Sequence, residues 1–425
     1  MDLASKLFKG DRAVWIIFML LCLISLVEVF SATSTLAYKN ANHWAPIVRH
    51  ATFLLGGFVI ILLIHNFHYR FFSVLIFLLP VSIVLLIATP WIGISANDAH
   101  RWLEIFGIQF QPSEFAKLSL IVFIAFMMSR RSRFTEKQIY YSILITAGIT
   151  CFIIFWENVS TAIMLFVISF LMMFIGQLPF WKLFRLGAGL VLGGCLLLFA
   201  IYNAPDDMLE KAPGRLTTVK ARLERYINPT EDVVDKNGNM LITDENYQEV
   251  HAKIAIARGG ILGKMPGHGQ QRDFLPQAYS DFIYAIIIEE LGIIIGGFGV
   301  LLLYIMLLVR GGIIAWKCEK PFAKYLVLGC TLVIVVQAFF NMAVAVDLFP
   351  VTGQPLPLVS RGGTSILISC IYIGVILSVS RFGAGMGNEE ELAVENTAEE
   401  NALDEKEMET VLASVEVETI EEANL

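Results

Sequence analysis

Long apolar runs separated by short polar stretches dominate the hydropathy pattern of this chain. A helical run of about 20 apolar residues matches the hydrocarbon thickness of a bilayer, so each run predicts a membrane-spanning helix. The first run follows Lys6, Lys9 and Arg12 and has no small-residue cleavage site, which favours a retained helix over a signal peptide. We expect ten spans, at residues 14–33, 49–65, 71–89, 112–129, 139–156, 160–177, 186–203, 281–309, 323–346 and 362–380.

One polar stretch, residues 204–280, is much longer than the others and separates the seventh span from the eighth. Loops of this length are usually functional or disordered. Residues 215–226 and 247–258 have helix-like patterns, and Asn237-Gly238 between two short apolar segments predicts a hairpin. We therefore expect an all-α polytopic membrane protein with a folded cap in this large loop.

Basic residues are divided unevenly among the short loops. The N-terminal segment and every second short loop after it hold most of the Lys and Arg residues, including Arg130, Arg131 and Arg133. The short loops between them hold only four. Because cytoplasmic loops carry the excess of Lys and Arg, both termini are expected in the cytoplasm. The loop at 204–280 is then extracytoplasmic.

Composition agrees with a membrane protein, since 56% of the residues are hydrophobic and only 16% are charged. These values exclude secreted disulfide scaffolds, nucleic-acid binders and ordinary cytosolic enzymes. The net charge of −7 is concentrated at one end, because residues 389–425 contain 14 acidic residues and one lysine. Such a segment is typical of disorder. We expect a membrane domain at 1–388 and an acidic disordered cytoplasmic tail at 389–425.

Neither the six cysteines nor the seven histidines have metal-ligand spacing. The cysteines lie in or beside apolar runs, which is typical of small core side chains. We predict no metal site built from these residues.

Ionisable residues at or inside predicted spans are the strongest candidates for chemistry, because a charge in hydrocarbon is costly. Asp281 begins the eighth span at the level of the outer headgroups, where its alternative role is a carboxylate favoured by the helix dipole. Glu289 and Glu290 follow eight and nine residues later. In a continuous helix they lie about 12–14 Å deeper, so buried pairing or function must account for them.

Cationic residues are expected around the outer mouth of the spans. Glu114 and Lys117 at the start of the fourth span form an i,i+3 pair, which is either structural or part of a site. Together the cations would suit a lipid whose headgroup carries phosphates. They are Arg49, Arg101, Lys117, Arg215, Lys220, Arg222, Arg225, Lys253, Arg258 and Lys264.

Six ordered groups of motifs resemble the SEDS family, the bacterial polytopic glycosyltransferases that include the FtsW and RodA branches. The segment before Asp281 is closer to the FtsW branch. Three features depart from the family pattern: Asn158 stands where a carboxylate is often expected, Arg361 replaces a common aromatic residue, and the stretch 230–246 is longer than is typical. The motifs lie at 101–103 with 111–117, at 222–229, at 247–248 with 255–260, at 275–285 with 289–292, at 350–360 and at 362–365.

The resemblance implies that the chain polymerises lipid II into peptidoglycan strands during cell division, with Asp281 as the general base. A divalent cation, Mg²⁺ or Mn²⁺, or the Arg and Lys residues would assist the diphosphate leaving group. Glu289 is assigned to a structural hydrogen-bond network near the cavity. The implied substrate-binding residues are Arg49, Arg101, Glu114, Lys117, Arg222, Gln248, Lys264 and Ser360.

The resemblance further implies a location in the bacterial cytoplasmic (inner) membrane, at the division septum. The implied partners are a class B penicillin-binding protein, other division proteins and membrane lipids, with no nucleic acid. Three alternatives stay open from the sequence: a flippase or transporter for the lipid-linked precursor, a scaffold without chemistry, and an elongation polymerase of the RodA type.

Overall fold

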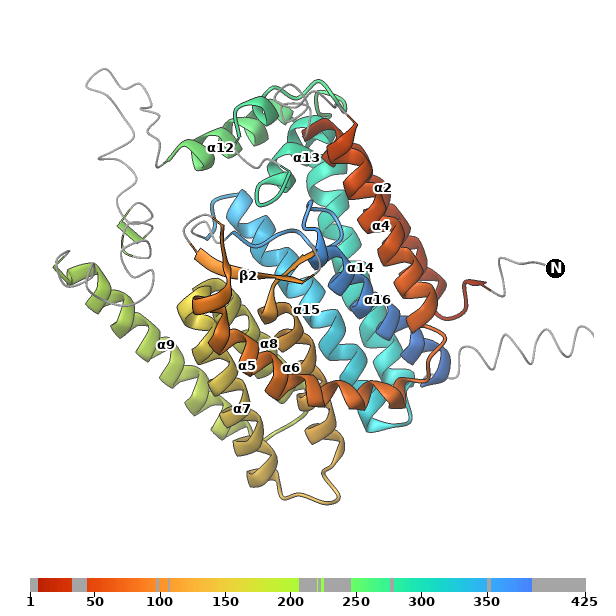
Figure 1. Cartoon of the computed structure of the whole chain (residues 1–425), viewed down its shortest axis with the longest axis vertical. Coiled ribbons are helices and arrows are strands. Elements are labelled where there is room, and N and C mark those ends of the chain that lie inside the picture. Colours follow the sequence, from red (N-terminus) through yellow and green to blue (C-terminus); the bar gives the residue numbers. More distant parts are fainter. Residues whose placement is uncertain are drawn as a thin grey trace, which may run out of the picture.

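The structure, a computed structural model of the chain, describes residues 7–32, 44–96, 99–105, 108–205, 220, 223–224, 246–275, 279–349 and 353–383. The predicted hairpin at Asn237-Gly238, the tail at 389–425 and all but three residues of the predicted helix at 215–226 lie outside these ranges. Within them, long helices pack side by side, and a smaller helical cap lies at one end (Figure 1). The cap consists of residues 246–275, which include helix α12 (Tyr247–Gly259). The expected all-α polytopic membrane fold is confirmed.

Nine helices within the described ranges are long and apolar enough to cross a bilayer, and one further apolar helix, α8, has 17 residues. A helix satisfies its own backbone hydrogen bonds, which a segment in lipid must do. These helices correspond to the ten predicted spans. They are α2 (Arg12–Ala32), α4 (Ala45–Ile64), η1 with α5 (Tyr69–Phe77 and Leu78–Ile92), α6 (Pro112–Ser129), α7 (Glu136–Glu157), α8 (Val159–Ile175), α9 (Phe180–Asn203), α13 through η3 to α14 (Ile283–Gly292, Ile293–Gly299 and Val300–Lys317), α15 (Pro321–Ala345) and α16 (Thr364–Phe382).

The helices differ strongly in how much of their surface the protein covers. In each of α6, α15 and α16, 72% of the residues in the 18-residue apolar stretch are buried, and these helices form the centre of the bundle. In α9 the share is only 6%. Figure 1 shows α9 at the edge of the bundle, opposite α2 and α4. The functional site is therefore expected near the central helices, whose positions are fixed by packing on several sides.

A small antiparallel sheet connects α5 to α6 and was not expected from the sequence, which suggested an interfacial loop around Arg101-Trp102. Strand β2 (Ala99–Ile105) pairs with β1 (Ile94–Ala96) on one side and with β3 (Ile108–Phe110) on the other. Trp102 pairs with Ile94, and Leu103 with Phe110. The sheet brings Trp102 and Gln109 to the same end of the bundle as the start of α6.

The predicted single span at 281–309 is wrong in one respect, because the chain reverses at Gly292. The hydroxyl of Tyr284 donates to the carbonyl oxygen of Gly297 at 3.0 Å, whereas a straight helix would separate these residues by about 20 Å. Gly292 has a φ of 78°, and a Cβ added there would lie 2.4 Å from the Ile261 carbonyl oxygen. Glycine is required for this turn because it alone combines a positive φ with such a close backbone approach.

This reversal also corrects the expected depth of Glu289 and Glu290, which lie at the end of α13 remote from Asp281 and not deeper in a continuous span. Helix α12 (Tyr247–Gly259) and the loop after it cover this end, as the helix-like pattern at 247–258 predicted. The Lys264 amide donates to the Glu289 carbonyl at 2.9 Å, and the Met265 amide to the Glu290 carbonyl at 2.8 Å. These bonds satisfy carbonyl groups that the end of a helix leaves without partners.

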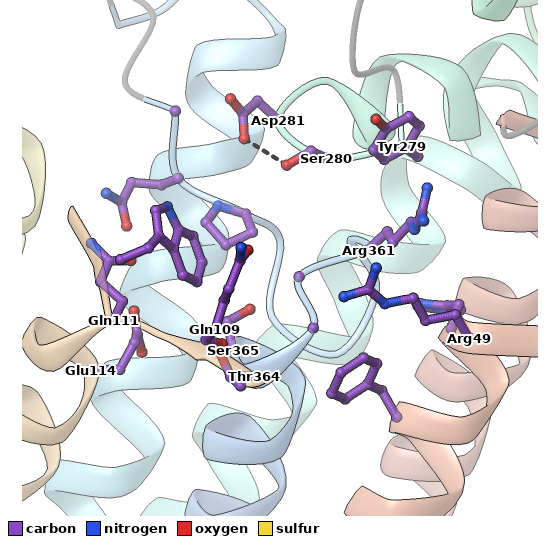
Figure 2. Close-up of a pocket in the computed structure, with 18 of the residues that line it drawn as sticks. Arg49, Gln109, Gln111, Glu114, Tyr279, Ser280, Asp281, Arg361, Thr364 and Ser365 are labelled. Atoms are coloured by element: carbon purple, nitrogen blue, oxygen red, sulfur yellow. Dashed lines mark hydrogen bonds between the residues drawn. The ribbon is translucent and has the colours of Figure 1, made fainter. Parts of the chain in front are cut away.

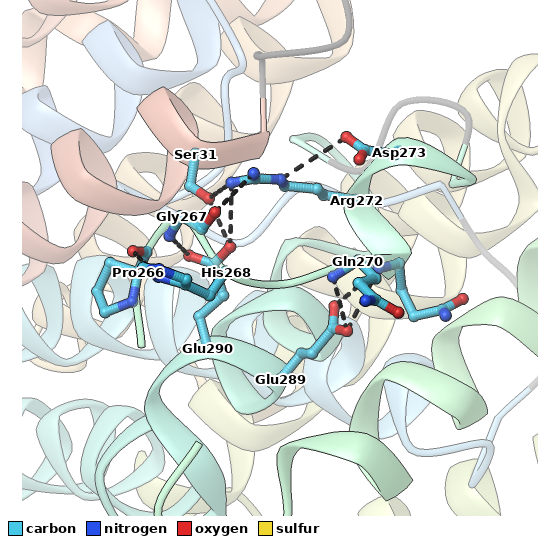
Figure 3. Close-up of polar contacts among 10 residues, drawn as sticks. Ser31, Pro266, Gly267, His268, Gln270, Arg272, Asp273, Glu289 and Glu290 are labelled. Atoms are coloured by element: carbon cyan, nitrogen blue, oxygen red, sulfur yellow. Dashed lines mark hydrogen bonds and ion pairs between the residues drawn. The ribbon is translucent and has the colours of Figure 1, made fainter. Parts of the chain in front are cut away.

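Both glutamate side chains are buried in a hydrogen-bond network that joins the cap to α2 (Figure 3). Glu289 accepts hydrogen bonds from the backbone amides of Gln270 and Gln271 at 3.0 and 3.1 Å. Glu290 accepts from the Gly267 amide at 3.0 Å and from the Ser31 hydroxyl at 2.5 Å, and lies 3.4 Å from an Arg272 nitrogen. The predicted structural network around Glu289 is present, but it lies under the cap and not beside the cavity as predicted.

Candidate functional site

A polar cavity of about 420 Å³ lies where several helix ends meet (Figure 2). Its walls come from the start of α4, from β2 and β3, from the first turn of α6, from the junction of α7 and α8, and from the segments that precede α13 and α16. Its lining residues are Arg49, His50, Phe53, Trp102, Gln109, Gln111, Glu114, Asn158, Tyr279, Ser280, Asp281, Gly353, Gln354, Pro355, Arg361, Gly362, Gly363, Thr364 and Ser365.

Asp281 lies in the wall of this cavity and is half-buried. The Ser280 hydroxyl donates to one carboxylate oxygen at 3.0 Å. A Cβ on Gly353 would lie 3.4 Å from the other oxygen, and Gly353 has a φ of 64°, so the backbone approaches the carboxylate closely at a position that favours glycine. Asp281 is thus a carboxylate in the wall of a polar cavity.

Hydrogen bonds from the turn before α16 and from α15 hold the segment that carries Asp281. The buried Ser360 hydroxyl donates to the Ser280 carbonyl at 2.6 Å and accepts from the Leu356 amide at 2.8 Å. The Asn341 side chain donates to the Asp281 carbonyl at 2.8 Å. Ser360, a predicted substrate-binding residue, is not part of the lining, and these contacts give it a positioning role.

Glu114 and Lys117 form the predicted pair but have different positions. The Lys117 ammonium lies 2.7 Å from a Glu114 carboxylate oxygen and donates to the Gln337 side chain at 3.1 Å. Lys117 is fully buried and does not line the cavity, whereas Glu114 does. A buried charge of this kind is stable only while paired, so Lys117 acts on the cavity through Glu114.

The other predicted substrate-binding residues are only partly brought together. Arg49 is exposed and lines the cavity. Arg101 lies in β2 beside the lining residue Trp102, but its side chain and the whole of Arg222 lie outside the described part of the structure.

Two further predicted residues lie in the cap. Gln248 is half-buried in α12, and Lys264 is exposed in the loop that follows it. Neither lines the cavity. Substrate contact by Gln248 or Lys264 stays a prediction.

Arg361 lines the cavity, although the sequence did not place it among the substrate-binding residues. Its guanidinium carbon lies 5.0 Å from the centroid of the Tyr279 ring, and its amide donates to the Tyr279 carbonyl at 2.9 Å. Burial lowers the pKa of Arg361, and the charge of Arg49 acts in the same direction, while Tyr279 opposes the shift. The signal in the sequence was the departure from the family pattern, a basic residue directly before Gly362-Gly363.

Asn158, the other departure in the lining, has a local role that its position explains. It is the N-cap of α8, and its side-chain oxygen accepts from the Thr161 amide at 3.1 Å. Asparagine is among the most favourable N-cap residues. A neutral amide therefore stands in the wall where a family carboxylate would add negative charge.

Among the described lining residues, the carboxylates are Asp281 and Glu114. Carboxylate oxygens are ligands that Mg²⁺ prefers, and in phosphate sites Mg²⁺ keeps waters and substrate oxygens among its ligands. In the part of the chain that the structure describes, no group of three or more His, Cys, Asp or Glu residues could hold a metal ion. A divalent cation in this cavity would therefore need substrate oxygens to complete its coordination.

The family model described as cell cycle protein, which covers FtsW, RodA and SpoVE, matches residues 11–384. A protein of Haemophilus influenzae named probable peptidoglycan glycosyltransferase FtsW is 32% identical over 382 residues, covering 87% of this chain and 90% of that protein. A protein of the same name in Geobacter sulfurreducens is 28% identical over 393 residues, covering 88% and 96%. Stage V sporulation protein E of Bacillus subtilis is 29% identical over 401 residues, covering 89% and 99%.

Solved structures share the fold at lower identity. A chain from a structure described as structural coordination of polymerization and crosslinking by a peptidoglycan synthase complex has a TM-score of 0.68 and 21% identity, covering 88% of this chain and 98% of its own. The rod shape determining protein RodA of Thermus thermophilus has a TM-score of 0.59 and 21% identity, covering 88% and 97%. The sequence match over nearly the whole membrane domain, supported by this likeness of fold, shows that the chain belongs to the FtsW/RodA/SpoVE family of cell cycle proteins.

Proposed function

We propose that this chain is a peptidoglycan glycosyltransferase that joins lipid II units into glycan strands at the outer face of the bacterial cytoplasmic membrane during cell division. Family membership and the names of its relatives support the class of reaction. The observation that carries the proposal is the position of Asp281, a carboxylate in the wall of a polar cavity at the ends of membrane helices.

In the proposed reaction Asp281 is the general base. It takes the proton of the acceptor sugar's 4-hydroxyl as that oxygen attacks the anomeric carbon of the donor. The bond from that carbon to the diphosphate breaks, and the lipid diphosphate leaves with the electron pair. Negative charge grows on the leaving group, so cationic groups in the wall stabilise the transition state. Arg49 and Arg101 are assigned to this task, with Glu114 binding sugar hydroxyls.

The proposed location is the division septum, with both termini and the acidic tail in the cytoplasm and the loop at 204–280 outside. The charge pattern of the short loops supports this orientation. The proposed partner is a class B penicillin-binding protein that crosslinks the new strand. The structural relative from a peptidoglycan synthase complex supports a partner of this kind.

A lipid-linked precursor flippase is the competing function. A flippase needs polar residues along the whole depth of the bilayer. The two glutamates that a continuous eighth span would have put deep in the membrane, Glu289 and Glu290, belong instead to the network under the cap. Their position favours the enzyme.

The deciding experiment is polymerisation of purified lipid II by the full-length chain in detergent, with and without its cognate transpeptidase. Transport has no meaning in detergent, so glycan strands on a gel would support the enzyme. If strands form only with the transpeptidase, its own glycan-forming ability must be tested in the absence of this chain. If no strands form under either condition, while the same chain moves labelled lipid II across vesicle membranes, the flippase is correct.

A further inference from the structure

The cavity has two walls of different charge (Figure 2). Arg49 and Arg361 lie on one side, from α4 and from the turn before α16. Gln111 and Glu114, from the start of α6, lie on the opposite side. One wall therefore offers positive charge and the other offers neutral amide groups and a carboxylate that is already paired with Lys117. A ligand with an anionic end and a hydroxyl-rich end would fit this arrangement in one direction only.

Within the described ranges, no carboxylate neutralises either of the two guanidinium groups. Among the residues that the structure describes, neither Arg49 nor Arg361 has a carboxylate within 4 Å. Burial is the main cause that lowers the pKa of Arg361, Tyr279 opposes the shift, and the charge of Arg49 adds to it. Two neighbouring like charges, one of them partly desolvated, are unfavourable unless an anion joins them.

Arg361 is also held in place before any ligand arrives. Its guanidinium stacks on the Tyr279 ring at 5.0 Å, and its amide is bonded to the Tyr279 carbonyl at 2.9 Å. A planar guanidinium can bind two phosphate oxygens at once, and a preset orientation lowers the entropic cost of doing so. The same contacts link Arg361 to the segment that carries Asp281.

A helix N-terminus lies beside the two arginines. Helix α16 begins at Thr364, and its N-cap, Gly363, provides no side-chain hydrogen bond to the first turn. Thr364 and Ser365 both line the cavity. The positive end of the dipole of a 19-residue helix thus faces the same space and adds to the attraction for an anion.

We propose that Arg361 and Arg49 form the subsite that binds the diphosphate of a prenyl-linked substrate, with its sugars extending toward the wall made by Gln111 and Glu114. The proposal rests on the function proposed above and makes Arg361 a substrate-binding residue of this chain. In this arrangement Asp281 lies beside the reacting sugar.

The test is direct binding of farnesyl diphosphate to the full-length chain in detergent, which needs no turnover. Loss of one charge-assisted contact predicts that R361Q weakens binding on the order of tenfold. R361K keeps the charge but not the planar fork, so about a threefold loss is expected. The matched control is R133Q, which removes an exposed arginine between α6 and α7 and should bind as wild type does. An unchanged Kd in R361Q, in protein with wild-type thermal stability, would overturn the proposal.

A competition arm identifies the source of the phosphate. Excess phosphatidylglycerol should not displace farnesyl diphosphate, because a single phosphate engages only part of the subsite. Equal displacement by the phospholipid would mean a general headgroup site and would contradict the proposal.

Kinetics separate this inference from the proposed function. In the polymerisation assay R361Q should raise the KM for lipid II by about the same factor as the Kd, with a smaller change in kcat. If farnesyl diphosphate binding depends on Arg361 but no glycan forms, the proposed function fails and the subsite stands. If glycan forms and R361Q keeps both the wild-type Kd and KM, the subsite is wrong.

Discussion

Two acidic regions lie within ten residues of one another in the sequence, and their surroundings are opposite. Glu289 and Glu290 are buried under the cap, where backbone amides, Ser31 and Arg272 bind their oxygens. Asp281 lies in a cavity wall, against a glycine and a hydroxyl. The two glutamates therefore hold the cap on the bundle, whereas Asp281 lies where we expect a substrate to reach it.

The largest expected effect is on the rate of polymerisation in D281N. The amide keeps the shape of the side chain and can still accept the Ser280 hydrogen bond, but it cannot take a proton. General base catalysis contributes roughly 10²–10⁴-fold, so a rate loss of about 10³-fold is expected with little change in stability. The measurement is the initial rate of glycan formation from lipid II, with unfolding followed on the same protein.

The matched control is D347N, which changes an exposed carboxylate outside the cavity. It should polymerise at the wild-type rate. A D281N protein that inserts normally and keeps more than about a tenth of the wild-type rate would show that another group accepts the proton.

The second effect is on stability, in E290Q. This change removes the ion pair between Glu290 and Arg272, whose side chain is only 15% exposed, and leaves Arg272 with the exposed carboxylate of Asp273 at 3.7 Å. Breaking a largely buried pair costs about 3 kcal/mol. The measurement is the free energy of unfolding in mild detergent titrated with a denaturing detergent. The comparison fails if E290Q is as stable as wild type but loses activity as D281N does, because Glu290 would then take part in the chemistry.

The third effect, in S360A, combines a loss of stability with a loss of rate. The buried Ser360 hydroxyl holds the carbonyl of Ser280, so its loss leaves that carbonyl without a donor at about 1–2 kcal/mol. The segment carrying Asp281 then becomes less well positioned. We expect kcat to fall about tenfold while the KM for lipid II stays the same, because Ser360 does not line the cavity. A raised KM with an unchanged kcat would indicate direct substrate contact instead.

The sequence predicted the spans well because runs of about 20 apolar residues are rare in chains that do not cross a membrane. It could not predict the reversal at Gly292, because apolar residues continue on both sides of that glycine and hydropathy does not depend on chain direction. Only the positive φ of Gly292 and its contact with the Ile261 backbone distinguish two antiparallel arms from one long helix.

The candidate site was predicted in part for a similar reason. The i,i+3 spacing of Glu114 and Lys117 predicted their pairing, but which of the two faces the cavity depends on Gln337 in α15, 220 residues away. Arg361 was noted only as a departure, because the sequence does not reveal that the turn before α16 folds beside Arg49 and Tyr279. The spacing of residues in the sequence predicts which side chains pair. Packing between distant parts of the chain decides which side chain of a pair faces the cavity.

The smallest expected effect calibrates the comparison. Lys253 in α12 and Asp347 after α15 form an ion pair at 2.6 Å, but their side chains are 45% and 44% exposed. Solvent screens such pairs, so K253Q should cost under about 1 kcal/mol, and less still at high salt. The measurement is the same detergent titration at two salt concentrations. A loss as large as that of E290Q, and unaffected by salt, would mean that the cap is held by its surface contacts, and the buried glutamates would no longer explain why it stays on α13.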